Sequence, residues 1–402
     1  MSVFQKILSL KAFTSKKNLK SFDVKNLKTS FASAWHCFKT SASYDQLAKQ
    51  GYVKNVIAYR SIQLIARGLA SIPWLLYTKN HELENHPLLN LLKTPNLKQA
   101  DSSFREELVS HLLINGNAYI LKTLSDNNLP LELHLLRPDR MTILKGDSSI
   151  PYGYVYEMGN KKYTFPLDPL TGQCQILHIK FFNPLDDWYG MAPLQAALKA
   201  IDQHNAVGDH NLALLQNGGR PSGAFVVKPS EYGSVLSDRQ RESLSKDLKE
   251  AYEGASNAGR VLFLEGDFEW KEMGLNLKDL DYIDGKNLSS REIAQAFGVP
   301  PMLVGVPGDA TFANYKEARY HLWEDTILPL IDLIVGELNK WLCPHFNQAL
   351  HIAYDADRIP ALSLRRESSW AKIAEVSFLT INEKRHAVGY GDHKDGDKLC
   401  IA

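Results

Sequence analysis

The side chains that could carry out catalysis in this chain do not combine into a recognised catalytic pattern. His81 and His86 enclose two glutamates, which approaches a zinc-protease pattern, but the histidines are five residues apart instead of four. Five residues of α-helix turn the second side chain by about 140° relative to the first, so the pair would not share a helix face. The segment Gly254–Gly259 is one residue too long for a nucleophile elbow. Neither segment predicts a hydrolase.

The other reactive residues are isolated from one another. His178 and His204 have no partner at a metal-binding spacing, so we interpret both as structural. The chain has no Gly-x-x-x-x-Gly-Lys-Ser/Thr loop, which excludes a P-loop nucleotidase. Acidic pairs at 186–187 and at 279 and 281 are too common to be specific. The sequence therefore predicts no catalytic residue, no metal site and no cofactor.

The composition is that of a folded protein. The chain has 402 residues, of which 44% are hydrophobic and 23% charged, and this length predicts two or more domains. No run approaches the roughly 18 apolar residues of a membrane-spanning helix, so we expect no membrane association. Four widely separated cysteines are typical of reduced thiols in a cytoplasmic setting: Cys37, Cys174, Cys343 and Cys400.

Charge is distributed unevenly along the chain. The whole chain has a net charge of +1, yet residues 1–40 contain eight lysines, one aspartate and no arginine or glutamate. This segment has no continuous hydrophobic run, so it does not resemble a secretory signal. It is interpreted either as a flexible, solvated basic arm or as an arm that docks onto an acidic partner or nucleic acid. The remaining residues carry a net charge of −6.

Residues 41–190 alternate between helical and strand patterns and predict a mixed α+β domain. Apolar residues at helical spacing predict a helix over 53–71, stopped by Pro73. Ser103 and Glu106 form a capping-box pattern for a second helix, which Gly116 ends. Strands are predicted at 74–77, 118–122, 131–136 and 176–180 and around the alternating tyrosines at 152, 154 and 156.

Two longer helices follow, separated by a small insertion. The first is predicted over 193–217, about 37 Å at 1.5 Å per residue, with Gly190 and Pro193 at its start and Gly218 and Pro221 among the breakers that end it. Residues 223–276 predict strands at 224–228, 260–264 and 268–273, with a charged helix from Ser237 to Tyr252. The second long helix is predicted over 279–297.

A junction of turn residues ends the second long helix. Gly298 supplies the helix stop, and Pro300 and Pro301 cannot continue the helix. Gly305 opens a loop that runs to residue 313, after which Asn314, with Glu317, is predicted to cap a new helix. Pro329 removes one backbone hydrogen bond of that helix, so we predict a kink there. Helical stretches are also predicted after Pro360 and after the capping box of Thr380 and Glu383.

The order of these segments resembles that of the phage portal protein family over about residues 50–395. The matching segments are Asn115–Tyr119, Leu135–Asp139, Tyr189–Leu194, Asn217–Gly223, Gly298–Gly305 and Leu379–Arg385 with Gly389. Their collinear order is more specific than any one of them. The resemblance implies an α+β portal fold, with an α/β wing, long stem helices, a small α/β clip, a kinked helix and a short helical C-terminal crown, assembled into a ring.

On this resemblance the chain divides into eight parts. They are a basic arm (1–40), the wing (41–190), stem helix 1 (191–221), the clip (222–276), stem helix 2 (277–298), a turn and tunnel loop (299–314), a kinked wing helix with the following segment (315–358), and a crown and tail (359–402).

The resemblance also implies a non-catalytic function. Portal subunits, typically twelve, form a ring at one capsid vertex, through which double-stranded DNA is packaged and ejected. The implied partners are the terminase large subunit, the major capsid protein or scaffold, and a head-tail adaptor. The implied location is the virion of a phage, prophage or phage-derived gene transfer particle, and the host cytoplasm during assembly. A near-neutral body suits such a passive conduit, because a duplex gripped by many phosphate contacts could not slide.

The same resemblance assigns roles to individual residues. The DNA-facing tunnel loop would comprise Gly308, Asp309, Ala310, Thr311, Phe312 and Ala313. Asp309 would repel phosphate and favour sliding, whereas Phe312 would either face DNA or pack between neighbouring subunits. Structural roles in stem and turn fall to Gly190, Pro193, Gly218, Pro221, Gly298, Pro300, Pro301, Gly305 and Pro329. Arg239, Glu242, Lys246 and Lys249 of the clip helix would dock partners or form a solvated face.

Two other functions compete with this interpretation. One is a non-catalytic scaffold or nucleic-acid-binding protein that acts through its basic N-terminal arm. The other is a hydrolase, for which the sequence shows no catalytic set.

Overall fold

The computed structural model describes most of the chain after the basic arm. The described residues are 43–79, 81–146, 150–216, 223–227, 239, 242–243, 246, 268–272, 282–308, 312–346, 349–388, 390–391 and 393–397. The chain divides into two units, Met1–Lys39 and Thr40–Ala402, and all the elements below belong to the second. Several residues that the resemblance assigns a role lie outside the described part: Gly218, Pro221, Lys249, Asp309, Ala310, Thr311 and Gly389. The same holds for Cys37, Cys400, the strand predicted at 260–264 and most of the helix predicted from Ser237 to Tyr252.

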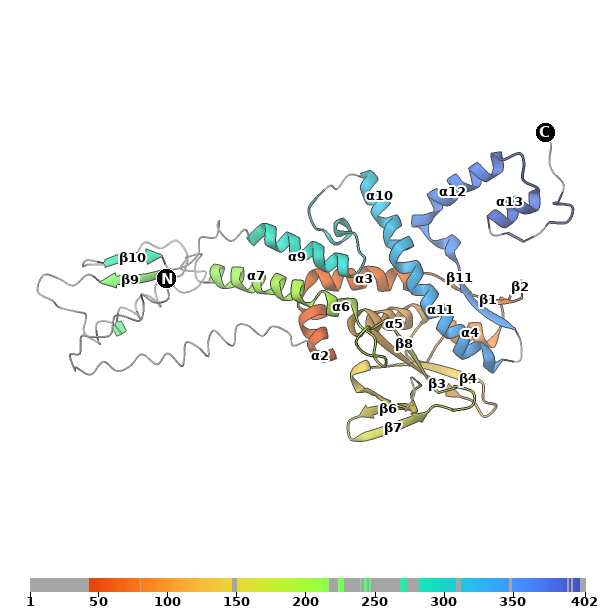
Figure 1. The fold of residues 1–402 in the computed structure, drawn as a ribbon, viewed down its shortest axis with the longest axis horizontal. Coiled ribbons are helices and arrows are strands. Elements are labelled where there is room, and N and C mark those ends of the chain that lie inside the picture. Colours follow the sequence, from red (N-terminus) through yellow and green to blue (C-terminus); the bar gives the residue numbers. More distant parts are fainter. Residues whose placement is uncertain are drawn as a thin grey trace, which may run out of the picture. The chain divides into compact units, whose positions relative to one another are not determined.

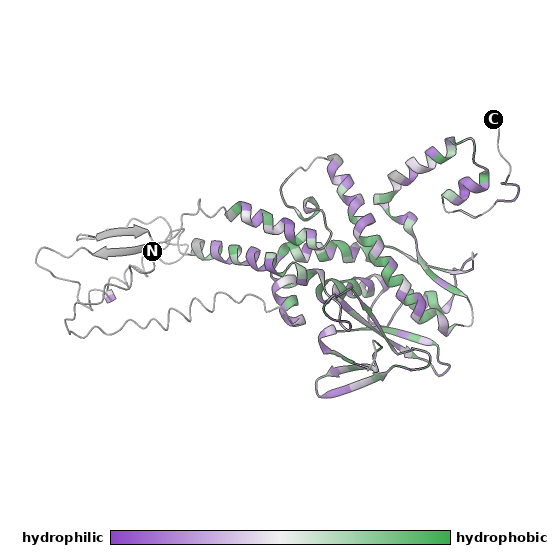
Figure 2. Cartoon of the chain, viewed as in Figure 1, coloured by the Kyte–Doolittle hydropathy of each residue, from purple (hydrophilic) through white to green (hydrophobic). Residues whose placement is uncertain are grey.

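Helices α3 (Val56–Ala70), α5 (Asp101–Asn115) and α11 (Leu328–Leu342) form the centre of the described unit. Ile62, Leu108 and Ile331 are fully or almost fully buried and belong to one hydrophobic cluster. Figure 2 shows that hydrophobic residues predominate in α3 and α11. Asn55 caps α3 by accepting hydrogen bonds from two backbone N–H groups. The burial of these apolar faces stabilises the packing of the three helices against one another.

Antiparallel strands border this helical core. One sheet has the order β4 (Pro130–Leu136), β3 (Asn117–Leu124), β8 (Ile176–Lys180), and a second has the order β5 (Met141–Leu144), β6 (Gly153–Met158), β7 (Lys161–Pro166). In a third sheet, β1 (Trp74–Thr78) lies between β11 (Leu350–Tyr354) and β2 (His81–Glu82). The strands predicted within residues 41–190 are thus confirmed, and β11 returns from the far end of the sequence to pair with β1.

Helix α5 begins earlier than the sequence pattern predicts. Its N-cap is Ala100, which offers no capping side chain, so the capping box assigned to Ser103 and Glu106 is wrong. Asp101 instead accepts hydrogen bonds from Trp74 Nε1 (2.9 Å) and Arg105 Nη2 (2.5 Å). These contacts with side chains on β1 and on the helix itself fix the first turn. The end of α5 is as predicted, because Gly116 adopts a left-handed conformation with φ 81°.

The two long helices are present and pack side by side (Figure 1). The first is divided into α6 (Pro193–Ala196), with Pro193 in its first turn, and α7 (Leu198–Gln216), so the single predicted helix is interrupted at Ala197. The second is α9 (Tyr282–Ala296). Between them in sequence, β9 (Gly223–Val227) and β10 (Phe268–Glu272) form an antiparallel pair.

The helical segment after the junction runs from α10 (Phe312–His321) through the π-helical η6 (Leu322–Ile327) into α11. Asn314 lies inside α10, so its predicted role as the N-cap is wrong. A kink was predicted at Pro329, and the structure has the π-helical segment η6, which ends two residues before this proline. Proline has no N–H to donate to the carbonyl four residues earlier, and a widened turn accommodates this.

The C-terminal part consists of short elements. Helix α12 (Pro360–Glu375) contacts α10, and α13 (Ile381–Ala387) begins with the predicted capping box, in which Thr380 and Glu383 each bond the other's backbone N–H. The remaining elements are α2 (Tyr44–Gln46), η2 (Leu47–Val53), α4 (Pro87–Lys93), η3 (Pro138–Arg140), η5 (Pro301–Val304), η7 (Cys343–His345) and η8 (Ala356–Arg358). Among the described residues, no helix combines the length and apolar character needed to cross a membrane.

Candidate functional site

The start of the first long helix is held by a buried asparagine. Asn117 is 2% exposed, and its Oδ1 accepts hydrogen bonds from the backbone N–H of Gly190 (2.7 Å) and from Nε2 of His178 (2.9 Å). Its Nδ2 donates to the carbonyl oxygens of Gly190 (3.3 Å) and Asn115 (3.1 Å). The Asn117 side chain therefore joins two separate sequence motifs, at 115–119 and at 189–194.

Gly116 and Gly190 approach each other too closely for any other residue. A Cβ on Gly190 would overlap the carbonyl oxygen of Gly116, and a Cβ on Gly116 would lie 2.6 Å from the carbonyl carbon of Met191. His178 stacks on Tyr119 at 4.4 Å between ring centroids, and burial together with Lys180 lowers the pKa of His178 to about 3. The histidine is therefore a neutral hydrogen-bond donor, which confirms its structural interpretation.

The α7–α9 pair is fixed at one end and exposes apolar side chains along its length. Ile201, Ile293 and Phe297 are buried against the core. Asn55 Nδ2 contacts His204 Nδ1 at 3.2 Å, so His204 is also structural. Three side chains of the pair remain largely exposed: Leu212 (54%), Ile283 (78%) and Leu288 (57%). More than half of each of these apolar side chains is therefore left uncovered in the single chain.

The end of α9 is a tight junction built on two glycines. Gly298 has φ 68° and Gly305 has φ 83°, both in the left-handed region that favours glycine. Between them, Pro300 and Pro301 lead into η5, and the backbone N–H of Val306 donates to the carbonyl oxygen of Pro301 (3.2 Å). The predicted helix stop at Gly298 is confirmed.

A hydrogen bond fixes the first residues of the predicted tunnel loop to α9. Arg291 Nη2 donates to the carbonyl oxygen of Pro307 at 2.7 Å, and a Cβ on Gly308 would lie 2.8 Å from that nitrogen. Gly308 is exposed. On the other side of the loop, Phe312 and Ala313 form the first turn of α10, so the prediction that the loop extends to residue 313 is wrong. The segment at 309–311 is thus preceded by a bend next to the Arg291 side chain and followed by α10.

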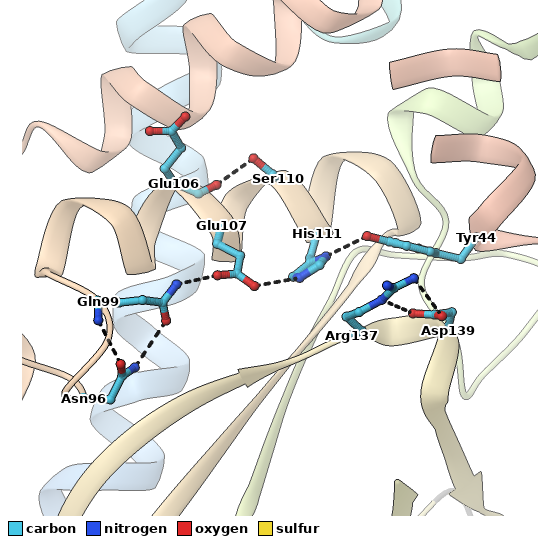
Figure 3. Close-up of polar contacts among 9 residues, drawn as sticks. All are labelled: Tyr44, Asn96, Gln99, Glu106, Glu107, Ser110, His111, Arg137 and Asp139. Carbon is cyan, nitrogen blue, oxygen red and sulfur yellow. Dashed lines mark hydrogen bonds and ion pairs between the residues drawn. The ribbon is translucent and has the colours of Figure 1, made fainter. Parts of the chain in front are cut away.

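A second polar network connects α2, the first described helix, to α5 (Figure 3). Tyr44 Oη lies 3.1 Å from His111 Nδ1, and His111 Nε2 lies 3.5 Å from Glu107 Oε1. Glu107 Oε2 accepts a 2.5 Å hydrogen bond from Gln99, which in turn accepts one from Asn96 at 3.2 Å. No local sequence motif indicated this polar network, because neighbouring members are up to 67 residues apart.

Glu107, His111 and Tyr44 follow the carboxylate, imidazole, hydroxyl order of a catalytic triad. The Tyr44 hydroxyl, however, is not one that loses its proton easily. Burial raises the pKa of the Tyr44 phenol to about 12, so the phenol stays protonated at neutral pH. The hydrogen bond to His111 is the main cause that lowers the pKa of Glu107. Arg137, itself paired with Asp139 at 2.9 Å, lies over the Tyr44 ring. This polar network therefore attaches α2 to α5.

Lys122 is a buried amine that has no carboxylate partner among the described residues. It is 2% exposed, and its Nζ lies 2.5 Å from His345 Nε2 and 4.6 Å from the centroid of the Trp341 ring. Burial lowers the pKa of Lys122 to about 8. Cys174 is close enough to interact with Lys122, but burial raises the pKa of its thiol. These contacts join β3 to the end of α11.

The other candidate residues are not brought together. His81 lies in β2 and His86 caps α4, and the described residues contain no group of three or more His, Cys, Asp or Glu that could hold a metal ion. Arg239, Glu242 and Lys246 are helical and exposed. Asn117, Arg291 and Thr326 were missed by the sequence analysis. Only the Asn115–Tyr119 motif contained a signal, since it placed an asparagine between a helix-ending glycine and a strand.

The chain resembles portal proteins along most of its length. The family described as phage portal protein matches residues 57–389. An uncharacterized protein of Rickettsia bellii (strain RML369-C) is 45% identical over 350 residues, covering 87% of this chain and 90% of that protein. The portal protein of Enterobacteria phage HK97 is 24% identical over 339 residues, covering 81% of this chain and 76% of that protein.

A solved structure gives the same result. A chain in the neck of a native GTA particle computed with C12 symmetry has a TM-score of 0.67 and 38% identity, covering 89% of this chain and 95% of that chain. The long helix pair, the junction at Gly298 and the α+β body all lie within the matched part of the sequence. The protein described here is a member of the phage portal protein family, with an α+β portal fold.

Proposed function

We propose that this chain is a portal subunit that forms a ring of twelve copies, through which double-stranded DNA enters and leaves a particle. The observation that carries the proposal is the match to a neck chain of a C12-symmetric GTA particle over 95% of that chain. The exposed Leu212, Ile283 and Leu288 on the helix pair support it, because adjacent copies would cover them. The proposed location is the portal vertex of a virion or gene transfer particle, after assembly in the host cytoplasm.

The parts of the chain take the following roles in this proposal. The α+β body from α2 to β8 with β11 is the wing, and α6–α7 and α9 are the stem. The segment at 222–276 is the clip, with Arg239, Glu242, Lys246 and Lys249 as docking residues. Residues 359–402 form the crown and tail. Terminase large subunit, major capsid protein or scaffold, and a head-tail adaptor are the proposed partners, and the chain itself is proposed to be non-catalytic.

The segment from Gly308 to Ala313, which runs from the junction into the first turn of α10, is proposed to face the DNA. Its supports are the junction at Gly298 and Gly305, which reverses the chain after α9, and the bond from Arg291 to Pro307, which orders its base. Asp309 would repel phosphate, and Phe312 would contact DNA or a neighbouring subunit.

Assembly is the first test. Purified protein is examined by mass photometry and negative-stain imaging over a range of concentrations, and rings with twelve subunits are expected. A protein that stays monomeric under all conditions contradicts the proposal. It would favour the alternative of a scaffold or nucleic-acid-binding protein acting through residues 1–40, which removal of those residues would then test by DNA binding.

The loop is tested separately from assembly. Deletion of Asp309–Thr311 leaves both Arg291–Pro307 and α10 in place, so rings are expected to form while packaged or retained DNA decreases. Replacing the same three residues with Gly-Ser-Gly is the matched control for loop length, and Asp309→Lys tests the charge alone. Nuclease-protected DNA per particle is measured. Normal packaging by the deletion would show that this loop is not the DNA-facing element.

A further inference from the structure

A groove lies between α3 and the α10–η6 segment. Its volume is about 280 Å³, and its floor is apolar, with Leu303, Leu322 and Ile327 among the lining residues. Gly68 on α3 lies close to η6, since a Cβ there would lie 2.7 Å from Cδ1 of Ile327. The groove is thus formed by side chains of α3, η5, α10 and η6.

The rim of this groove is positively charged. Arg60 and Arg67 of α3 and Arg319 of α10 all line it, and all three are exposed. Arg67 pairs with Glu106 at 3.2 Å, whereas no hydrogen bond or ion pair joins Arg60 or Arg319 to another described residue. At least two guanidinium groups of the rim are thus available to an acidic partner.

One lining residue also has an unused polar atom. Gln63 is 5% exposed, and its Nε2 donates to Tyr52 Oη at 2.7 Å. Its Oε1 is buried and has no hydrogen-bond partner in the described part of the chain. The groove therefore presents charge and apolar surface, and a buried amide is among its lining residues.

The opposite face of α10 carries the complementary charge. His321 lies between two carboxylates, with Nε2 3.7 Å from Glu317 and Nδ1 3.0 Å from Asp325. The Glu317, His321 and Asp325 side chains are each at least 52% exposed. Arg319 and His321 are two residues apart, which separates them by about 200° around the helix. We call Glu317, His321 and Asp325 the acidic stripe.

We propose that the groove of one copy binds the acidic stripe of the next copy, so that α10 contributes a different face to each of its two neighbours. The inference rests on the proposed ring. A ring interface is heterologous, which requires two different and complementary surfaces on every subunit. The charges of the groove and the stripe meet this requirement. Opposite charges across an interface also fix the register of the subunits.

Two charge-reversed variants test this assignment. Arg60→Glu with Arg319→Glu reverses the groove, and Glu317→Lys with Asp325→Lys reverses the stripe. The substituted side chains are exposed, and circular dichroism and thermal melting of the monomers verify their folding. At the concentration where the unmodified protein is half assembled, each variant alone is expected to form at least about tenfold fewer rings.

An equimolar mixture of the two variants is the decisive measurement. Glutamates in the groove of one variant face lysines in the stripe of the other, and the second interface keeps its original charges. The mixture is therefore expected to restore rings in which the variants alternate, detected by native mass spectrometry with one variant mass-tagged. The chain with all four substitutions should also assemble. Lys98→Glu, an exposed reversal away from the groove, is expected to assemble normally.

The possible failures are distinguishable. If the unmodified protein forms rings and both variants do so equally well alone, the groove is not the interface, while the portal role stands. If neither the variants nor their mixture assembles, the two surfaces do not face each other and the inference is wrong. Normal rings with reduced binding of duplex DNA would make the groove a phosphate site instead. An unmodified protein that never assembles contradicts both the inference and the proposed function.

Discussion

The side chain of Thr326 donates a 2.8 Å hydrogen bond to the carbonyl oxygen of Gly298. This bond joins the last turn after α9 to the π-helical η6 immediately before Pro329. A Cβ on Gly298 would lie 2.6 Å from the same Thr326 Oγ1. The junction thus combines a left-handed backbone, a side-chain bond and close packing at a single residue.

Gly298→Ala is expected to destabilise the fold more than Gly305→Ala. Both substitutions place a Cβ on a left-handed residue, which costs about 1 kcal/mol or more. Only Gly298 adds an overlap, since no atom lies within 4 Å of a Cβ on Gly305. Urea unfolding of the two variants measures the difference, and we expect about 1–3 kcal/mol. Equal free energies of unfolding would show that η6 moves away from the junction without cost.

Arg291→Met is expected to loosen the base of the loop without lowering global stability by more than about 1 kcal/mol. The reason is that Arg291 is exposed and its bond to the Pro307 carbonyl oxygen holds only the local chain. Hydrogen exchange in peptides covering 303–312 should become faster than in the unmodified protein. Glu292→Gln, an exposed change on the next residue of α9, is the control. Unchanged exchange in the Arg291 variant would mean that the proline segment orders itself.

Local signals in the sequence predicted the parts of the fold that local chemistry determines. The helix ends at Gly116 and Gly298 followed from the requirement for a left-handed residue, and the capping box at Thr380 followed from side chains three residues apart. The strands were visible from their apolar and β-branched composition. Because the family motifs are also local, they predicted the order of elements and the family.

Contacts between distant segments could not be predicted in this way. Arg105 donates to the carbonyl oxygen of Ile72, and Trp74 bonds Asp101, so tertiary contacts rather than Ser103 decide where α5 begins. β11 pairs with β1, and Asn117 contacts Gly190. No local sequence pattern indicates either of these contacts. The groove has the same origin, because Arg60 and Arg319 are on helices that meet only in the folded chain.

Asn117→Ala is expected to lower the free energy of unfolding by about 3 kcal/mol. The substitution leaves the buried N–H of Gly190 and the His178 side chain without their acceptor. Asn115→Ala removes only the one side-chain contact that Asn115 Oδ1 makes with Asn117 and should cost about 1 kcal/mol. Chemical denaturation at neutral pH compares the two variants. Similar losses for both would mean that Asn117 is not the centre of this network.

Lys122→Met is expected to change how stability depends on pH. The pKa of Lys122 is about 8 in the folded chain and close to its ordinary value of 10.5 in the unfolded chain. Between these values the unfolded state binds more protons, so stability should rise with pH in the unmodified protein. Methionine cannot titrate, so the variant should lose this rise, about 2 kcal/mol between pH 8 and pH 9.5.

The measurement is the free energy of urea unfolding of both proteins at the two pH values, because their double difference cancels all other titrating groups. Below pH 8 the folded protein holds a charged lysine against His345 and Trp341, so the methionine variant should be the more stable one there. Lys93→Met, an exposed lysine at the end of α4, should leave the pH dependence unchanged. The same pH dependence in the Lys122 variant and the unmodified protein would show that the buried amine keeps its ordinary pKa.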